Sequence, residues 1–421
     1  MNSVLIRNVE LGKKTRDILI VNGVFSKISD GGTLPCPDGT ALIDGSHKAI
    51  LPAFYNTHTH AAMVLMRSYA DDMELFPWLN EHIWPLEARL TAEDVYNGTR
   101  LAILEMIRSG TVFFDDMYFF PATIARAAEE MGVRAAVGKL CFEGADGKIQ
   151  GRCLEMVAEL EALQDSLSDR IIITEAPHAI YTVGERNLRT ISERAAERRA
   201  FVHIHVAETR QEFDDCMRMH GMTPIAYLDS IGLLNERLLA AHSVWMTDED
   251  LALAADRQAV LSHMPCSNLK LGSGAFRYYA ARNSGCRITI GTDGCASNNN
   301  LSMLEEMKFA ALCAKREADN VTAAPAGEIY RAASCNGAEA FGIAAGEIAV
   351  GKAGDCILVD LHDTRLLGEG DLIANMVYSA DSRCIDTVIC NGRILMEDGK
   401  IKGEEEIIAA AAESCARLAR G

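Results

Sequence analysis

The chain has 421 residues, of which 49% are apolar and 24% are charged, and its formal net charge at pH 7 is -18. This length suits one large domain with a smaller one, or two to three small domains. The composition is typical of a globular protein with a substantial core. The acidic balance disfavours a nucleic acid or an anionic membrane as a partner, because both attract a basic protein face.

Thirteen cysteines are scattered along the chain without any Cys-x-x-Cys spacing. We therefore expect free, mostly buried thiols in a reducing compartment. The first residues lack the basic start and the long apolar stretch of a signal peptide. No window reaches 18 apolar residues without a charge, so we expect a cytoplasmic protein that does not span a membrane.

Short strands separated by turns are predicted at both ends of the chain. Near the start they lie at 4–8, 17–21, 24–28 and 41–44, and Asn22-Gly23 is a hairpin signal. Near the end they lie at 356–360, 384–390 and 393–396, with a second Asn-Gly turn and a closing helix at 404–420. We expect one small β-sandwich domain built from both termini, residues 1–51 and 346–421.

Between residues 52 and 345, short apolar runs alternate with helical periodicity. The helical stretches include 92–108, 185–198, 248–256 and 301–318. The eight apolar runs lie at 49–56, 111–117, 134–141, 171–178, 201–208, 238–242, 259–266 and 287–293. Strands of this kind indicate a parallel sheet with a covered outer face. We expect an α/β fold, a (β/α)8 barrel of the TIM type. An open doubly wound sheet is the alternative, and it lacks the support of a Gly-x-Gly-x-x-Gly motif.

Polar residues gather at the predicted carboxyl ends of these strands, where barrel enzymes carry their active sites. His58 and His60 are one residue apart, so their side chains point to the same side of a strand. His205 ends the fifth strand and Asp293 ends the eighth. Zinc takes imidazole and carboxylate ligands. We therefore expect these four residues to bind one ion, although a lone histidine is more often a core residue and Asp293 could form a turn.

Neighbouring residues are candidates for the chemistry around such an ion. Glu208, three residues past His205, can face the same cavity and move protons between water and substrate; a surface or helix-capping glutamate is the alternative. His242 could orient the water or polarise the attacked carbon, with metal ligation as its alternative. We expect His203 to be a packed, hydrogen-bonded residue one layer below His205. His263 is left without a role.

These motifs, in this order, resemble the amidohydrolase superfamily: His-x-His, the strand-five histidine with its glutamate, Ala-His and Gly-Thr-Asp-Gly. Longer stretches resemble one branch of it, the 5′-methylthioadenosine/S-adenosylhomocysteine deaminases. Those stretches are residues 65–72, 78–87, 177–181, 205–209, 267–271 and 292–301. The similarity covers essentially the whole chain, and several of the stretches also occur in triazine hydrolases and other aminohydrolases.

The resemblance implies hydrolytic deamination of an adenosine-type nucleoside to the inosyl product and ammonia. The candidate substrates are 5′-methylthioadenosine, S-adenosylhomocysteine, adenosine and 5′-deoxyadenosine. The resemblance also implies one zinc ion, or iron(II), at the four ligands above, with Asp293 taking a proton from water and Glu208 protonating the purine ring. It further implies substrate contacts from Glu87 to the ribose hydroxyls, from His178 to the nucleoside and from Arg152 near the 5′ substituent.

Two-metal barrels often carry a carboxylated lysine at the end of strand four, and this chain has no lysine there, which favours a single ion. Ile180, Met264 and Asn375 stand where the family commonly has proline, asparagine and histidine. These differences leave the 5′ substituent open. The alternatives are an aminohydrolase or chlorohydrolase of guanine, a pterin or a triazine, and a non-catalytic scaffold. We also expect a homo-oligomer.

Overall fold

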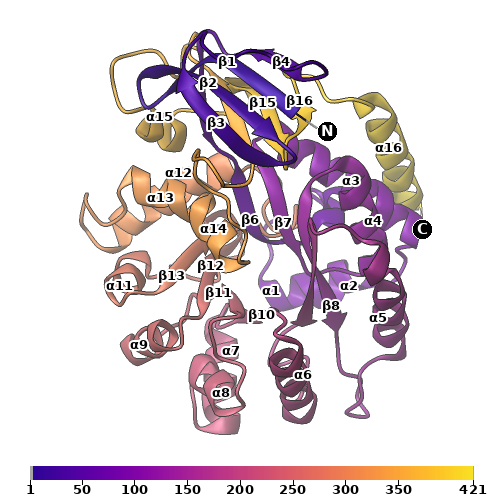
Figure 1. Ribbon diagram of the computed structural model, residues 1–421. Helices are drawn as coiled ribbons and strands as arrows, with labels where there is room; N and C mark the ends of the chain where they lie inside the picture. The colour runs from indigo at the N-terminus through magenta and orange to yellow at the C-terminus, as the bar shows by residue number, and fades with distance from the viewer. Residues whose placement is uncertain (1–2, 421) are drawn as a thin grey trace.

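The computed structural model describes residues 3–420 and contains two sheets (Figure 1). One sheet joins the two ends of the chain in the order β16-β15-β14-β5-β1-β2-β3, and β4 pairs with β1. Its strands are β1 (Ser3–Leu11), β2 (Lys14–Val21), β3 (Val24–Asp30), β4 (Ala41–Asp44), β5 (Lys48–Pro52), β14 (Cys356–Asp360), β15 (Ile385–Cys390) and β16 (Arg393–Met396). Apolar side chains from both termini, such as Ile18, Phe25 and Leu358, form a separate small core in this sheet.

Two Asn-Gly turns connect neighbouring strands of the terminal sheet, as their sequences predict. The φ angles are 49° at Asn22 and 81° at Gly23, and 49° at Asn391 and 70° at Gly392. A tight two-residue hairpin of this kind needs a positive φ at both central positions, which asparagine and glycine adopt at little cost.

The second sheet is the predicted parallel barrel, and its strand order β13-β12-β11-β10-β9-β8-β7-β6 follows the chain. The strands are β6 (Phe54–Thr59), β7 (Thr111–Asp116), β8 (Arg134–Cys141), β9 (Ile171–Pro177), β10 (Val202–Val206), β11 (Leu238–His242), β12 (Val260–His263) and β13 (Arg287–Ile290). The first and last strands meet where the His58 carbonyl accepts the backbone N–H of Thr292 at 3.1 Å and that of Asp293 at 3.0 Å. These contacts bring the two ends of the sheet together.

One predicted strand is wrong in its extent. The apolar run 49–56 was expected to be the first barrel strand, but the structure divides it between β5 of the terminal sheet and β6 of the barrel. β5 pairs with β14, and the Phe54 amide donates to the Gly110 carbonyl at 2.9 Å as β6 begins. The sequence pattern does not mark this change of sheet, because the apolar run continues from partly buried β5 into fully buried β6.

Helices surround the barrel, and several begin and end where the periodicity predicts (Figure 1). α3 (Ala92–Arg108), α6 (Glu185–Arg198) and α9 (Asp248–Asp256) match their predicted ranges, while the predicted 301–318 shortens to α12 (Met303–Glu317). Capping boxes at Thr91 and Thr247 explain the starts of α3 and α9.

The remaining α-helices are α1 (Leu75–Pro77), α2 (Trp84–Glu87), α4 (Pro121–Met131), α5 (Gly151–Leu163), α7 (Arg210–His220), α8 (Pro224–Ser230), α10 (Pro265–Lys270), α11 (Tyr278–Asn283), α13 (Ala326–Ala333), α14 (Cys335–Ala340), α15 (Leu372–Tyr378) and α16 (Glu404–Arg420). Short 3-10 turns lie at Ala61–Met66, Gln164–Ser166 and Ser382–Cys384, and a π-helical turn at Trp78–Ile83 joins α1 to α2. The closing helix α16 lies along α3, where the Asn97 side chain donates to Ser414 at 3.1 Å (Figure 1). Among residues 3–420 no helix has the length and apolar character to cross a membrane.

A buried ionic cluster joins the terminal sheet to the amino end of the barrel. Asp355, just before β14, accepts hydrogen bonds from Arg134 Nε at 2.8 Å, from the Asn391 amide at 2.6 Å and from the Tyr55 hydroxyl. The Asp355 side chain is fully buried and that of Arg134 is 8% exposed. Burial removes most of the water that would stabilise these two charges. Each charge is therefore stabilised mainly by the other.

We expect Arg134→Leu to lower the free energy of unfolding by about 3–5 kcal/mol, since it leaves the Asp355 carboxylate buried without its cation. Urea denaturation measures this change. Arg218→Leu is the matched control, because Arg218 pairs with Asp215 on the surface with side chains 69% and 40% exposed and such pairs contribute little. Equal unfolding midpoints for the two variants would show that the cluster does not stabilise the junction.

Candidate active site

Four side chains from three widely separated segments meet at the carboxyl end of the barrel. His58 and His60 come from the end of β6, His205 from β10, and Asp293 follows β13. His60 Nε2 lies 3.4 Å from His205 Nε2 and 3.4 Å from Asp293 Oδ1, and His58 Nε2 lies 3.6 Å from the same oxygen. Ligand atoms in a tetrahedral site with bonds of ~2.0–2.2 Å are about 3.3–3.6 Å apart. The three measured distances have the spacing of a divalent-metal site, and His58, His60 and Asp293 form a group that could hold an ion, with His205 beside His60.

The hydrogen bonds behind these ligands leave their Nε2 atoms free for a metal. His60 Nδ1 lies 2.7 Å from the Met117 carbonyl oxygen, and His205 Nδ1 lies 2.7 Å from the His178 carbonyl oxygen. A carbonyl only accepts, so each Nδ1 carries the proton and each Nε2 keeps its lone pair. His58 Nε2 is buried without a hydrogen-bond partner among residues 3–420. A metal ion is a partner that fits this set of nitrogen and oxygen atoms.

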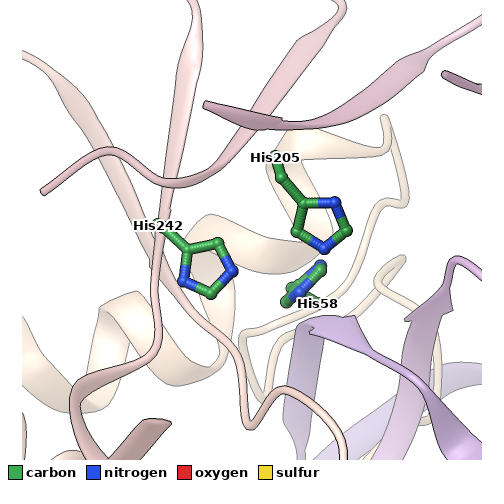
Figure 2. Close-up of side chains that lie close together, drawn as sticks. All are labelled: His58, His205 and His242. Carbon is green, nitrogen blue, oxygen red and sulfur yellow. The ribbon is translucent and has the colours of Figure 1, made fainter. Parts of the chain in front are cut away.

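Figure 2 shows the rings of His58, His205 and His242 close together at the strand ends. Their nearest nitrogen atoms lie within 4.8 Å of one another, so this trio could also hold an ion. His242 Nε2 lies 3.8 Å from Glu208 Oε2, and its Nδ1 lies 2.8 Å from Asn268 Oδ1. His242 thus borders the predicted ligand group, where it can contact either the ion or the water and substrate.

The chain turns sharply where these strands end. Ala207, His242 and Asp293 have left-handed backbone, with φ angles of 51°, 69° and 61°. Such conformations cost non-glycine residues about 1–3 kcal/mol and persist where the surrounding structure enforces them, often at functional sites. Left-handed backbone thus occurs at each of the strand ends that carry His205, His242 and Asp293.

Glu208 lies in the cavity beside the ligand group and is only 4% exposed. Its backbone amide and that of Ala207 donate to the two carboxylate oxygens of Glu212, each at 2.9 Å, and the Ser273 hydroxyl lies 3.3 Å from Glu208 Oε1. The N-cap of α7 is Thr209, so Glu208 is not the helix cap. Burial raises the pKa of Glu208, and the nearby His242 opposes that shift. A carboxyl group with a raised pKa holds its proton more readily than an exposed glutamate does.

Two adjoining cavities lead from the ligand group to the surface. The inner cavity, about 60 Å³, is bordered by His60, His205, Glu208, His242 and Asp293. The outer cavity is about 770 Å³, which lies within the ~300–1,000 Å³ range of small-molecule sites. The two share the side chains of Trp84, Glu87, Phe119, Phe142 and Tyr181. A small molecule that moves from the outer cavity to the predicted metal ligands therefore passes Glu87.

The three predicted substrate contacts lie at different depths. Glu87 is buried at the junction of the two cavities. Burial raises the pKa of its carboxyl group to about 7, although the hydrogen bond with Tyr118 and the positive charge of Arg152 both lower it. The ring of His178 stacks on Phe142 at 4.5 Å and borders the inner cavity. Arg152 lines only the outer cavity, near the start of α5. The structure thus brings Glu87 and His178 near the ligand group and leaves Arg152 farther out.

Several polar neighbours of the site received no role from the sequence. Ser267 Oγ donates to Asp293 Oδ2 at 2.6 Å, and Asn268 holds His242. Both follow the seventh predicted strand closely, so the strand-end position that marks the ligands could have marked them. His263 stacks on Phe276 at 4.3 Å, and burial lowers its pKa to about 3, as for a packed neutral ring.

Comparisons with known proteins agree with this architecture. Over 381 residues, 90% of each chain, the sequence is 48% identical to the 5-methylthioadenosine/S-adenosylhomocysteine deaminase 1 of Archaeoglobus fulgidus. It is 45% identical to the 5′-deoxyadenosine deaminase of Methanospirillum hungatei, over 89% of this chain and 84% of that one. An adenosine deaminase from Xanthomonas campestris, solved with bound zinc, superimposes with a TM-score of 0.92 at 32% identity and covers 100% of this chain and 98% of that one. Residues 49–395 match the amidohydrolase family, and the chain belongs to that family.

Proposed function

We propose that this protein is a zinc-dependent enzyme that hydrolytically deaminates an adenosine-type nucleoside, giving the inosyl product and ammonia. The observation that carries the proposal is the position of Glu208, a buried carboxyl group 3.8 Å from His242 and beside a group of side chains that could hold a metal ion. The relatives named for deamination of 5′-methylthioadenosine, S-adenosylhomocysteine and 5′-deoxyadenosine support this substrate class.

The side chains around the cavity can share the steps of the reaction. A zinc ion held by the three histidines and Asp293 would supply Lewis-acid activation of water near neutral pH. Asp293, held by Ser267 through Oδ2, takes a proton from the attacking water. Glu208 gives a proton to the purine ring nitrogen as C6 becomes tetrahedral. His242, held by Asn268, donates a hydrogen bond to the oxygen that replaces the amine, and the amine leaves as ammonia after it gains a proton.

The two cavities divide the substrate between them. We place the purine at the inner cavity, where it reaches Glu208 and the predicted metal ligands and where the walls include Trp78, Leu79 and Ile83 from the helical segment above the site. The ribose then lies at the junction, where ionised Glu87 can accept hydrogen bonds from its hydroxyls. The 5′ substituent extends into the outer cavity toward Arg152.

We further propose a cytoplasmic location and a homo-oligomeric assembly for the enzyme. The location is supported by the thirteen cysteines, all of which are free. The assembly is an expectation from the fold, and analytical ultracentrifugation measures it directly.

We expect chelator-treated protein to bind one zinc ion per chain and to gain thermal stability from it, because a ligand that binds only the folded state stabilises it by about 2.7 kcal/mol at 100 times its Kd. His60→Ala should lose this gain, since it removes one of the four ligands. His220→Ala is the control, because His220 lies on α7 and stacks on Tyr227 outside the metal group. Differential scanning calorimetry with and without zinc measures the shift. Two zinc ions per chain, or an unchanged zinc response in His60→Ala, would contradict the site.

We expect Glu208→Gln to lower kcat by about 10²–10⁴, because glutamine cannot deliver a proton to the ring nitrogen. The assay follows the ultraviolet absorbance of the adenine chromophore and ammonia release with four nucleosides that differ at the 5′ carbon. Zinc content should stay at the wild-type level, and Glu193→Gln on the exposed face of α6 should have wild-type activity. If zinc-loaded wild-type protein converts none of the four nucleosides, the proposed function is wrong.

We expect kcat/KM for a nucleoside to rise as the pH increases through about 7, because Glu87 has a pKa of about 7 in the free protein and only its ionised form accepts from both ribose hydroxyls. Glu87→Gln should flatten this limb. Glu87→Ala should lower kcat/KM for nucleosides by about 10–100-fold, the loss of hydrogen bonds to a charged group, and should change turnover of free adenine much less. Equal losses for nucleoside and free base would favour an enzyme that acts on another heterocycle.

A further inference from the structure

A buried chain of polar side chains connects His58 to a carboxylate on a neighbouring strand. His58 Nδ1 lies 2.7 Å from His203 Nε2, and His203 Nδ1 lies 3.1 Å from Asp115 Oδ2. The side chains of Asp115 and His203 are 0% and 1% exposed. Among residues 3–420, His203 Nδ1 and both Asp115 oxygens are buried without a partner in hydrogen-bond geometry, and the 3.1 Å contact between His203 Nδ1 and Asp115 Oδ2 is a close approach of two groups that can pair. The proposed deamination does not use Asp115 or His203 directly.

His58 differs from the other two predicted histidine ligands in what its Nδ1 contacts. His60 and His205 each face a backbone carbonyl, which accepts and never donates, so the backbone alone sets their tautomers. The neighbour of His58 is a second imidazole, which can either donate or accept. The tautomer of His58 is therefore undetermined until another group sets the tautomer of His203.

Only one arrangement of protons along this chain leaves His58 able to bind a metal ion through Nε2. His58 must then carry its proton on Nδ1 and donate it to His203 Nε2. His203 in turn carries its proton on Nδ1, where it faces Asp115, and the ionised carboxylate accepts it. In the reverse arrangement His203 donates to His58 Nδ1, and the proton of His58 occupies Nε2, the atom that the metal needs.

We propose that Asp115 and His203 are positioning residues that hold His58 in its metal-binding tautomer, an inference that rests on the proposed metal site. The ionised Asp115 selects the Nδ1 tautomer of His203, and His203 passes this selection to His58. The negative charge of the carboxylate also makes the His58 ring a stronger donor to the ion.

Asp115→Asn is the sharpest variant, because it keeps the size of the side chain and reverses its hydrogen bonding. The new amide can donate to His203 Nδ1, which favours the reverse arrangement and a proton on His58 Nε2. We expect its zinc Kd to rise by about 10–100-fold, the usual loss when a group behind a ligand is changed. Competition with a chromophoric chelator measures Kd. Histidine ¹⁵N spectra of the metal-free protein should show the His58 proton on Nδ1 in the wild type and on Nε2 in the variant.

Asp116→Asn is the matched control. Asp116 is the next residue of β7 and is equally buried, but its carboxylate faces the Ala61 amide at 3.4 Å. This variant makes the same Asp-to-Asn change at the next, equally buried position without touching His203, so its zinc Kd should stay within about threefold of wild type. A loss in Asp115→Asn that Asp116→Asn does not share is then specific to the contact with His203 and is not a general effect of changing a buried aspartate on β7.

Two substitutions of His203 give a second, independent comparison. The side-chain oxygen of His203→Gln can still accept from His58 Nδ1, whereas His203→Leu offers no acceptor. We expect the glutamine variant to bind zinc more tightly than the leucine variant by about tenfold, at similar thermal stability of the metal-free proteins.

The outcomes separate this inference from the proposed function. Wild-type protein that binds no zinc would contradict the metal site itself. Wild-type protein that binds zinc but carries the His58 proton on Nε2 when metal-free would overturn the inference, and this measurement does not require any variant to fold. Equal zinc affinity in Asp115→Asn and Asp116→Asn would also overturn it.

Discussion

The site depends on the contact between the first and last barrel strands. The His58 carbonyl accepts the backbone amides of Thr292 and Asp293 at 3.1 and 3.0 Å, so one backbone contact places the first and the last predicted ligand side by side. Gly291 makes this approach possible, because a Cβ atom there would lie 2.7 Å from the His58 amide nitrogen. Some 230 residues of chain separate these ligands, and the distance of 3.6 Å between His58 Nε2 and Asp293 Oδ1 follows from closure of the sheet.

Around this contact, each predicted ligand or reactive side chain is oriented by a hydrogen bond from its far side to another residue. Backbone carbonyls hold His60 and His205, Ser267 holds Asp293, and Asn268 holds His242. Such preorganisation matters in a buried cavity, because water is not available to reorient and electrostatic interactions are stronger there. The same burial raises the pKa of the Glu208 carboxyl, which suits it to carry a proton in the proposed reaction.

The sequence was informative wherever a local pattern decides the structure. Strand ends rich in histidine predicted where His58, His60, His205 and Asp293 would gather, and helical periodicity predicted α3, α6 and α9. The divided run at 49–56 was not predictable, because the change of sheet at Ala53 depends on pairing with β14, some 300 residues away. The contacts of Asp115 with His203 and of Ser267 with Asp293 were missed for the same reason: each joins residues from different strands or loops whose side-chain directions only the closed barrel sets.

The proposed reaction depends on one metal ion shared by the four predicted ligands at the carboxyl end of the barrel. Anomalous diffraction at the zinc edge, from crystals of the zinc-loaded protein, tests this most directly. We expect a single anomalous peak per chain, within coordination distance of His58, His60, His205 and Asp293. Two peaks in the cavity, or one peak that Asp293 does not contact, would contradict a single metal site with these four ligands.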